Sequence, residues 1–207
     1  MEQGLHHHRI DDQTEKSSKD LILPIHYSSL NLGFCKQIMR AQLSGLIVLP
    51  HGLGLDNQTY LALQKAINDQ QIFNLEQAWH QQDSTFIRER AAFCGELFAM
   101  KADERYELIN LLSQYQNQQD PSSQLMAVII ATASLTKFHL WESLGLKERK
   151  DLGSLINHNF SELFALNTDN MRWKRFFYRQ LCEQGGDYIC RAPSCQECQS
   201  YRECFVS

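Results

Sequence analysis

Residues 120–140, with the sequence DPSSQLMAVIIATASLTKFHL, decide the fold of this 207-residue chain. Asp120 belongs to the residue types that cap helices, and Pro121 is tolerated in a first helical turn because its missing N–H would have no partner there. From Leu125 to Leu140 the sequence is apolar almost all round rather than along a single stripe. Helices of this kind are buried on every side. We therefore expect a central helix with other helices packed around it.

Helical periodicity continues on both sides of this stretch. Apolar residues recur there at three- and four-residue steps, the spacing typical of one apolar helix face. The segments are Cys35–Leu46, Tyr60–Ile67, Thr85–Met100, Asp103–Tyr115, Leu152–Phe164 and Trp173–Leu181. Only Leu46–Leu49 has the character of a short strand. These patterns predict an all-α fold.

Residue types at the segment ends indicate where individual helices begin and stop. Asp56 and Asn170 are predicted to cap the helices that follow them, because their side chains accept hydrogen bonds from the first backbone N–H groups. Gly185-Gly186 is expected to end the last helix, because glycine adopts the left-handed conformation of a helix C-terminus most easily.

The chain divides into one helical domain and two flanking segments. Residues 1–26 are mostly polar, and they are predicted to form a disordered N-terminal tail because they bury too little apolar surface to offset the entropy of ordering. Residues 27–184 are predicted to form a single helical bundle domain. Residues 185–207 are predicted to form a cysteine-rich metal-binding loop.

Composition excludes several classes of function. The net charge of −4 argues against nucleic-acid binding, which needs an excess of Lys and Arg. The sequence has no apolar run long enough to span a membrane and no apolar stretch of a secretory signal near its start. We therefore expect a cytoplasmic protein. In a reducing cytosol, clustered cysteines are more often metal ligands than disulfides.

Four of the seven cysteines lie in the last eighteen residues, as Cys190-x4-Cys195-x2-Cys198-x5-Cys204. Four thiolates on so short a segment are able to ligate one inorganic centre. The compact spacing favours an iron–sulfur cluster, whereas structural zinc sites usually take their ligands from two more widely separated pairs. A zinc site remains the alternative, and the odd cysteine count disfavours a disulfide knot.

Residues 170–182 have the sequence NMRWKRFFYRQLC, and the cysteine segment after them contains an Ala192-Pro193-Ser194 insert. Together with the cysteine spacing, these residues resemble the NifQ family. HLWESLGL at 139–146 and LPHGLGL at 49–55 are also similar, and the likeness runs from about Gly33 to Phe205. The chain departs from the family pattern at Ser134 and at Glu142-Ser143.

The resemblance implies a role in nitrogen fixation. NifQ-like proteins are expected to be non-catalytic iron–sulfur proteins that take up molybdenum, with molybdate as its source, and supply it for assembly of the iron–molybdenum cofactor. The implied partners are the NifEN scaffold and the nitrogenase iron protein NifH, and the implied metal and cluster ligands are Cys190, Cys195, Cys198 and Cys204. An iron–sulfur electron carrier and a zinc-stabilised helical interaction module are the alternatives.

Other residues near the cysteine segment are candidates for secondary roles. Four cations, Arg172, Lys174, Arg175 and Arg179, are positioned to attract molybdate or an acidic partner, or else form a solvated helix face. His139 is interpreted as a hydrogen-bonded core histidine, with a molybdenum ligand as the alternative. Cys182 is expected to be buried rather than a further metal ligand, and Cys35 and Cys94 are predicted packing residues.

Overall fold

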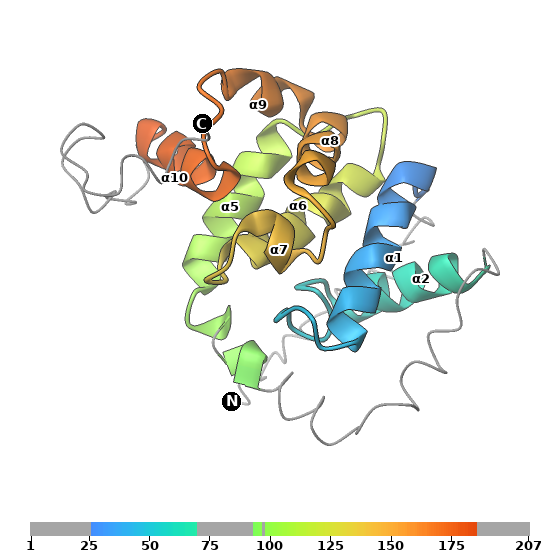
Figure 1. Cartoon of the computed structure of the whole chain (residues 1–207). Helices are drawn as coiled ribbons and strands as arrows, with labels where there is room; N and C mark the ends of the chain where they lie inside the picture. Colours follow the sequence, from blue (N-terminus) through green and yellow to red (C-terminus); the bar gives the residue numbers. More distant parts are fainter. Residues whose placement is uncertain (1–25, 70–92, 97, 186–207) are drawn as a thin grey trace, which may run out of the picture.

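A computed structural model describes residues 26–69, 93–96 and 98–185 (Figure 1). Every regular element in these ranges is an α-helix, so the predicted all-α class is confirmed and Leu46–Leu49 forms no strand. Three predicted segments lie largely outside the described residues: the tail 1–26 except for His26, most of the helix Thr85–Met100, and the cysteine-rich loop 185–207 except for Gly185. The helices are α1 (Ser29–Leu43), α2 (Asn57–Asp69), α5 (Ala102–Gln114), α6 (Ser122–Ser134), α7 (Leu140–Ser143), α8 (Arg149–Asn159), α9 (Ser161–Leu166) and α10 (Trp173–Glu183).

Helix α6 lies at the centre of the described helices, as its all-round apolar sequence predicts. Eleven of its thirteen residues are buried, and it packs against α1, α5 and α7 (Figure 1). Its fully buried Met126, Ile129 and Ile130 have no exposed surface. Each such side chain stabilises the fold by roughly 1.5–3 kcal/mol relative to an exposed one.

The end of α6 differs from the sequence-based prediction. The apolar pattern continues to Leu140, but the helix ends at Ser134. Two lysines bind the carbonyl oxygens that follow: Lys101 Nζ donates to Leu135 O over 3.3 Å, and Lys174 Nζ donates to Thr136 O over 2.9 Å and to Phe138 O over 2.5 Å. Cations are favourable at the negative C-terminal end of a helix. These contacts stabilise the turn that follows α6, and the short helix α7 begins after it.

Other helix boundaries agree only in part with the capping signals. Thr59 N donates to Asp56 Oδ1 over 2.9 Å, which confirms Asp56 as the cap of α2. Gly185 has φ +83°, as expected for a glycine after a helix end. Asn170 does not cap α10; it has φ +50° and Arg172 directly precedes the helix. The predicted helix Leu152–Phe164 is divided at Phe160, whose extended φ of −145° separates α8 from α9.

Candidate functional site

The four predicted ligands Cys190, Cys195, Cys198 and Cys204 lie outside the described residues. Within the ranges that the structure describes, no group of three or more His, Cys, Asp or Glu side chains is arranged to hold a metal ion. The described part therefore shows the surroundings of α10, the helix that leads the chain toward the cysteine segment.

Helix α10 is fixed to the domain by an aromatic stripe. Trp173, Phe176, Phe177 and Leu181 are buried, and α10 packs against α5. The ring centroids of Trp173 and Phe177 lie 5.9 Å apart, and those of Trp173 and Phe176 lie 5.7 Å apart in an edge-to-face arrangement. Such ring pairs add to the stabilisation from burial. The stripe fixes which way the basic residues of α10 point.

Lys174 does not belong to a solvated cationic face. Besides the two carbonyl oxygens at the end of α6, its ammonium group lies 3.0 Å from Thr136 Oγ1 and 3.4 Å from Ser143 Oγ. Burial and, to a smaller extent, the charge of the nearby Lys101 lower the pKa of Lys174 to about 8, although Glu142 opposes this shift. This lysine links α10 to the α6–α7 turn. The prediction that Lys174 lies on a solvated helix face is therefore wrong.

The other three basic residues near α10 have separate environments. Arg179 is exposed and ion-paired, with its Nε 2.8 Å from Glu183 Oε1 and its Nη1 3.8 Å from Asp169 Oδ2. Arg175 is exposed, and Arg172 is half-buried. Arg172 also lies close enough to Arg149 that its charge, after the larger effect of burial, lowers the pKa of Arg149. The four cations therefore do not form one anion-attracting surface.

His139 is an exposed residue at the start of α7 rather than a core histidine. Its backbone N–H donates to Glu142 Oε2 over 3.0 Å, which gives Glu142 a role in beginning that helix. Ser134 is buried and its hydroxyl donates to Ile130 O over 2.8 Å. These contacts give two of the residues where the chain departs from the family pattern a structural role.

The three described cysteines are not alike. Cys35 is fully buried and Cys94 is 2% exposed, which confirms their prediction as packing residues. Burial raises the pKa of Cys35 to about 12, so its thiol is protonated at neutral pH. Cys182, near the end of α10, is half-buried rather than buried as expected.

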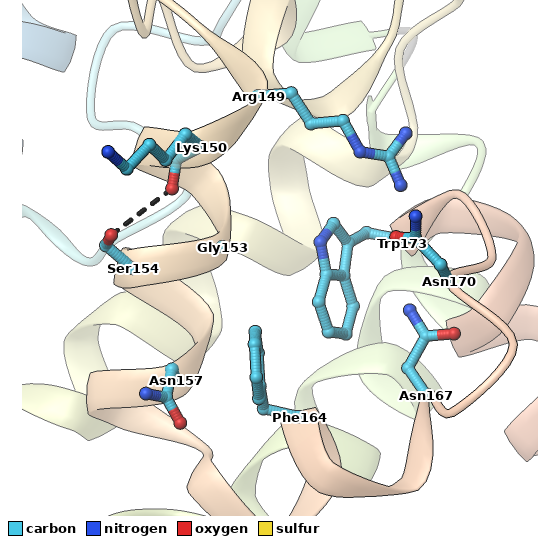
Figure 2. Close-up of a pocket in the computed structure, with 9 residues that line it drawn as sticks. All are labelled: Arg149, Lys150, Gly153, Ser154, Asn157, Phe164, Asn167, Asn170 and Trp173. Carbon is cyan, nitrogen blue, oxygen red and sulfur yellow. Dashed lines mark hydrogen bonds between the residues drawn. The ribbon is translucent and has the colours of Figure 1, made fainter. Parts of the chain in front are cut away.

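A pocket between α8, α9 and the loop before α10 was not predicted from the sequence. It has a volume of about 450 Å³. Its described lining combines two cations, four uncharged polar side chains, two aromatic rings and a glycine, and none of these residues is a carboxylate. The residues are Arg149, Lys150, Gly153, Ser154, Asn157, Phe164, Asn167, Asn170 and Trp173 (Figure 2).

Helical spacing explains how α8 supplies one side of this pocket. Arg149, Gly153 and Asn157 are four residues apart and share one helix face. Opposite them, Phe164 of α9 stacks on Trp173 with centroids 5.5 Å apart. Asn167 is held in place by Met171, because its amide accepts from Met171 N over 2.8 Å and donates to Met171 O over 3.0 Å.

The pocket has a positive end. Arg149 Nη2 donates to Met171 O over 3.3 Å, and Figure 2 shows its guanidinium directed toward the loop that carries Asn167 and Asn170. Among the residues that the structure describes, neither Arg149 nor Lys150 forms an ion pair. A guanidinium has five N–H donors, so most of those on Arg149 remain available to a ligand.

Two sequence signals could have pointed to this pocket. Arg149 and Lys150 open a helix, where the macrodipole favours acidic residues instead. Gly153 lies inside the same helix, where glycine is destabilising relative to alanine. Both features reduce the stability of α8, and unfavourable local choices of this kind are typical of functional sites.

These features define a class of protein: a helical domain with a cation-lined pocket, followed in the sequence by four closely spaced cysteines. The NifQ family model matches residues 34–206, and the chain belongs to the NifQ family. Membership in this family implies a role in nitrogen fixation.

Individual relatives agree with this assignment. The chain is 39% identical to Protein NifQ of Azotobacter vinelandii over 190 residues, which cover 90% of this chain and 93% of that protein. It is 45% identical to Protein NifQ of Klebsiella pneumoniae over 117 residues, or 56% of this chain and 68% of that protein. A Protein NifQ homolog of Sinorhizobium fredii is 46% identical over 100 residues, or 48% of this chain and 44% of that protein.

No solved structure significantly matches the chain. None of the helices in the described ranges combines the length and the apolar character that a membrane crossing requires.

Proposed function

We propose that this protein is a non-catalytic, cytoplasmic molybdenum carrier that supplies the metal for assembly of the iron–molybdenum cofactor of nitrogenase. Cys190, Cys195, Cys198 and Cys204 bind an iron–sulfur cluster, and the molybdenum cargo is held on this sulfur-rich centre. NifEN and NifH are the proposed partners. The observation that carries the proposal is membership in the NifQ family over a range that includes all four cysteines.

The chemistry of the donor set supports this function. Thiolates are soft ligands that hold iron–sulfur clusters, and four of them satisfy one cluster. When bound, the cluster supplies sulfide ligands that suit molybdenum better than the oxygen ligands of molybdate. Among the described cysteines, Cys35 is fully buried and protonated at neutral pH, so its thiol does not compete for the metal.

The helical domain supports the proposal through the way it presents the cysteine segment. The aromatic stripe of α10 anchors the helix that directly precedes this segment in the chain. Lys174 adds contacts from α10 to the α6–α7 turn. We infer that the domain provides a rigid base from which the cysteine segment delivers its cargo.

Single substitutions in the cysteine segment test the ligand assignment. Cys190→Ala in protein purified without oxygen is expected to lose the visible absorption of the cluster and most of its bound iron, because three thiolates do not complete the centre. Ser200→Ala is the matched control in the same segment and should keep both. Full iron content and an unchanged spectrum in Cys190→Ala would remove this residue from the ligand set.

A further inference from the structure

We propose that the pocket between α8, α9 and the loop before α10 is a reception site for a tetrahedral oxyanion, which in this protein is molybdate. The inference deepens the proposed function, because it names where the cargo first binds. Every lining residue that the structure describes lies between 149 and 173, before the cysteine segment in the sequence.

The chemistry of the cargo calls for two sites. Molybdate is a hard, negatively charged oxyanion, whereas thiolates are soft, negatively charged ligands. A cluster ligated by four thiolates therefore repels the anion before any ligand exchange. A cationic site with N–H donors is needed to concentrate the anion near the protein, and charged groups in a partly enclosed pocket attract it more strongly than the same groups in water.

The lining of the pocket matches this requirement. Arg149 has unused N–H donors, and the side-chain amide of Asn170 makes no hydrogen bond to the described part of the chain. Arg172 is not a lining residue, but its positive charge lies near enough to Arg149 to lower the pKa of that guanidinium. Because none of the described lining residues is a carboxylate, the described lining favours anions over cations.

Gly153 provides an independent argument for a ligand. Its φ is not in the left-handed region, and a Cβ atom built there would meet only Phe164 Cε2, at 4.0 Å. Neither backbone conformation nor close packing therefore requires glycine at this position. Alanine would stabilise α8, so the glycine is explained if the space above it must stay open. The volume of about 450 Å³ accommodates an oxyanion together with several of its waters.

Molybdate binding to a cluster-free protein tests the site separately from the cluster. The full chain with Cys190, Cys195, Cys198 and Cys204 all replaced by serine is dialysed against molybdate, and bound molybdenum is measured. We expect saturable binding at one site. Arg149→Gln, which removes the main cation of the pocket, should weaken binding by roughly tenfold or more, the usual effect of losing a charged hydrogen bond. Gly153→Leu should weaken binding because its side chain fills the space that the anion would occupy.

Matched controls separate pocket effects from general ones. Gly33→Leu introduces the same side chain on α1, where no heavy atom lies within 4 Å of the added Cβ. Arg175→Gln removes an exposed cation outside the pocket. Both should bind molybdate as the parent does, and circular dichroism should show that all variants remain helical.

Two results would overturn the proposal: no molybdate binding by the cluster-free chain, or unchanged binding in both Gly153→Leu and Arg149→Gln. The proposed function fails by a different result, the absence of iron and molybdenum from the native protein. The two failures are therefore distinguishable.

Discussion

At the scale of single residues, Asp120 shows how one side chain joins distant parts of the chain. Its Oδ1 accepts hydrogen bonds from the backbone N and the hydroxyl of Ser122, at 3.0 and 2.5 Å. Its Oδ2 lies 2.7 Å from His158 Nε2 and 3.1 Å from Asn31 Nδ2. Asn159 completes the network by exchanging amide hydrogen bonds with Asn31. The network joins α1, α6 and α8 at one buried point.

This network predicts a specific acid sensitivity. Burial alone raises the pKa of Asp120, but hydrogen bonds from Ser122, Ser28 and His158 outweigh it and lower the pKa to about 2. Because the folded-state pKa lies below the unfolded value, the stabilisation is fully present above about pH 4 and is lost as the pH falls toward 2. It amounts to about 2 kcal/mol. Urea unfolding at several pH values should show this loss in the parent chain.

Asp120→Asn should lower the free energy of unfolding by about 2 kcal/mol at neutral pH and remove much of the loss between pH 4 and 2. Asp103→Asn, an exposed carboxylate in the first turn of α5, is the control and should cost less than about 0.5 kcal/mol. Equal pH profiles for Asp120→Asn and the parent would show that the network does not stabilise the carboxylate.

The sequence predicted that Asp120-Pro121 begins a helix, but not the contacts that Asp120 makes. Capping is a local effect, and it is visible in residues two or three positions apart. The partners Asn31, His158 and Asn159 are far away in the sequence, and no local pattern relates them. The environment of Lys174 was not predicted for the same reason. The α10 pattern indicated a cation next to an apolar stripe, but it did not indicate that the ammonium group binds carbonyl oxygens of the α6–α7 turn.

At the scale of secondary-structure elements, close approach of α1 to the turn after α7 fixes their packing. Gly145 has φ +63°, and a Cβ atom there would lie 2.3 Å from Ala41 Cβ on α1. Gln37 Nε2 donates to Gly145 O over 3.0 Å, which holds the two segments together. Both the backbone conformation and the lack of a side chain are needed at this position.

Gly145→Ala should therefore lower the free energy of unfolding by roughly 2–4 kcal/mol, because it combines a strained φ with a clash against α1. Gly33→Ala, on the open surface of α1, should instead raise it by about 0.5–1 kcal/mol through helix propensity. Thermal or urea unfolding of both variants checks the pair. A Gly145→Ala protein as stable as the parent would contradict the close packing.

The existence of most helices was predictable, whereas several of their ends were not. The period of apolar residues identified α6, α8 and α10, since burial of one face requires that period. The apolar pattern did not show that α6 ends at Ser134, because the carbonyl oxygens after that end are bound by Lys101, which precedes α5, and by Lys174 of α10, both distant in the sequence. The pocket was missed for a related reason: it is formed by α8, α9 and a loop that come together only in the folded chain.

At the scale of the whole molecule, we assign different roles to the helical domain and to the four-cysteine segment. The helical domain anchors α10 and provides a cation-lined pocket, and the four-cysteine segment that follows it provides soft ligands. Only the second part was evident from the cysteine spacing. The first required the folded arrangement of residues between 149 and 173.

The proposed carrier role is tested most sharply by the metal content of the full chain, purified without oxygen from cells supplied with molybdate. We expect a coloured protein that contains molybdenum together with iron and acid-labile sulfide. Iron and sulfide without molybdenum would indicate an electron carrier. A colourless protein that contains zinc, with no iron or sulfide even after reconstitution, would contradict the carrier assignment altogether.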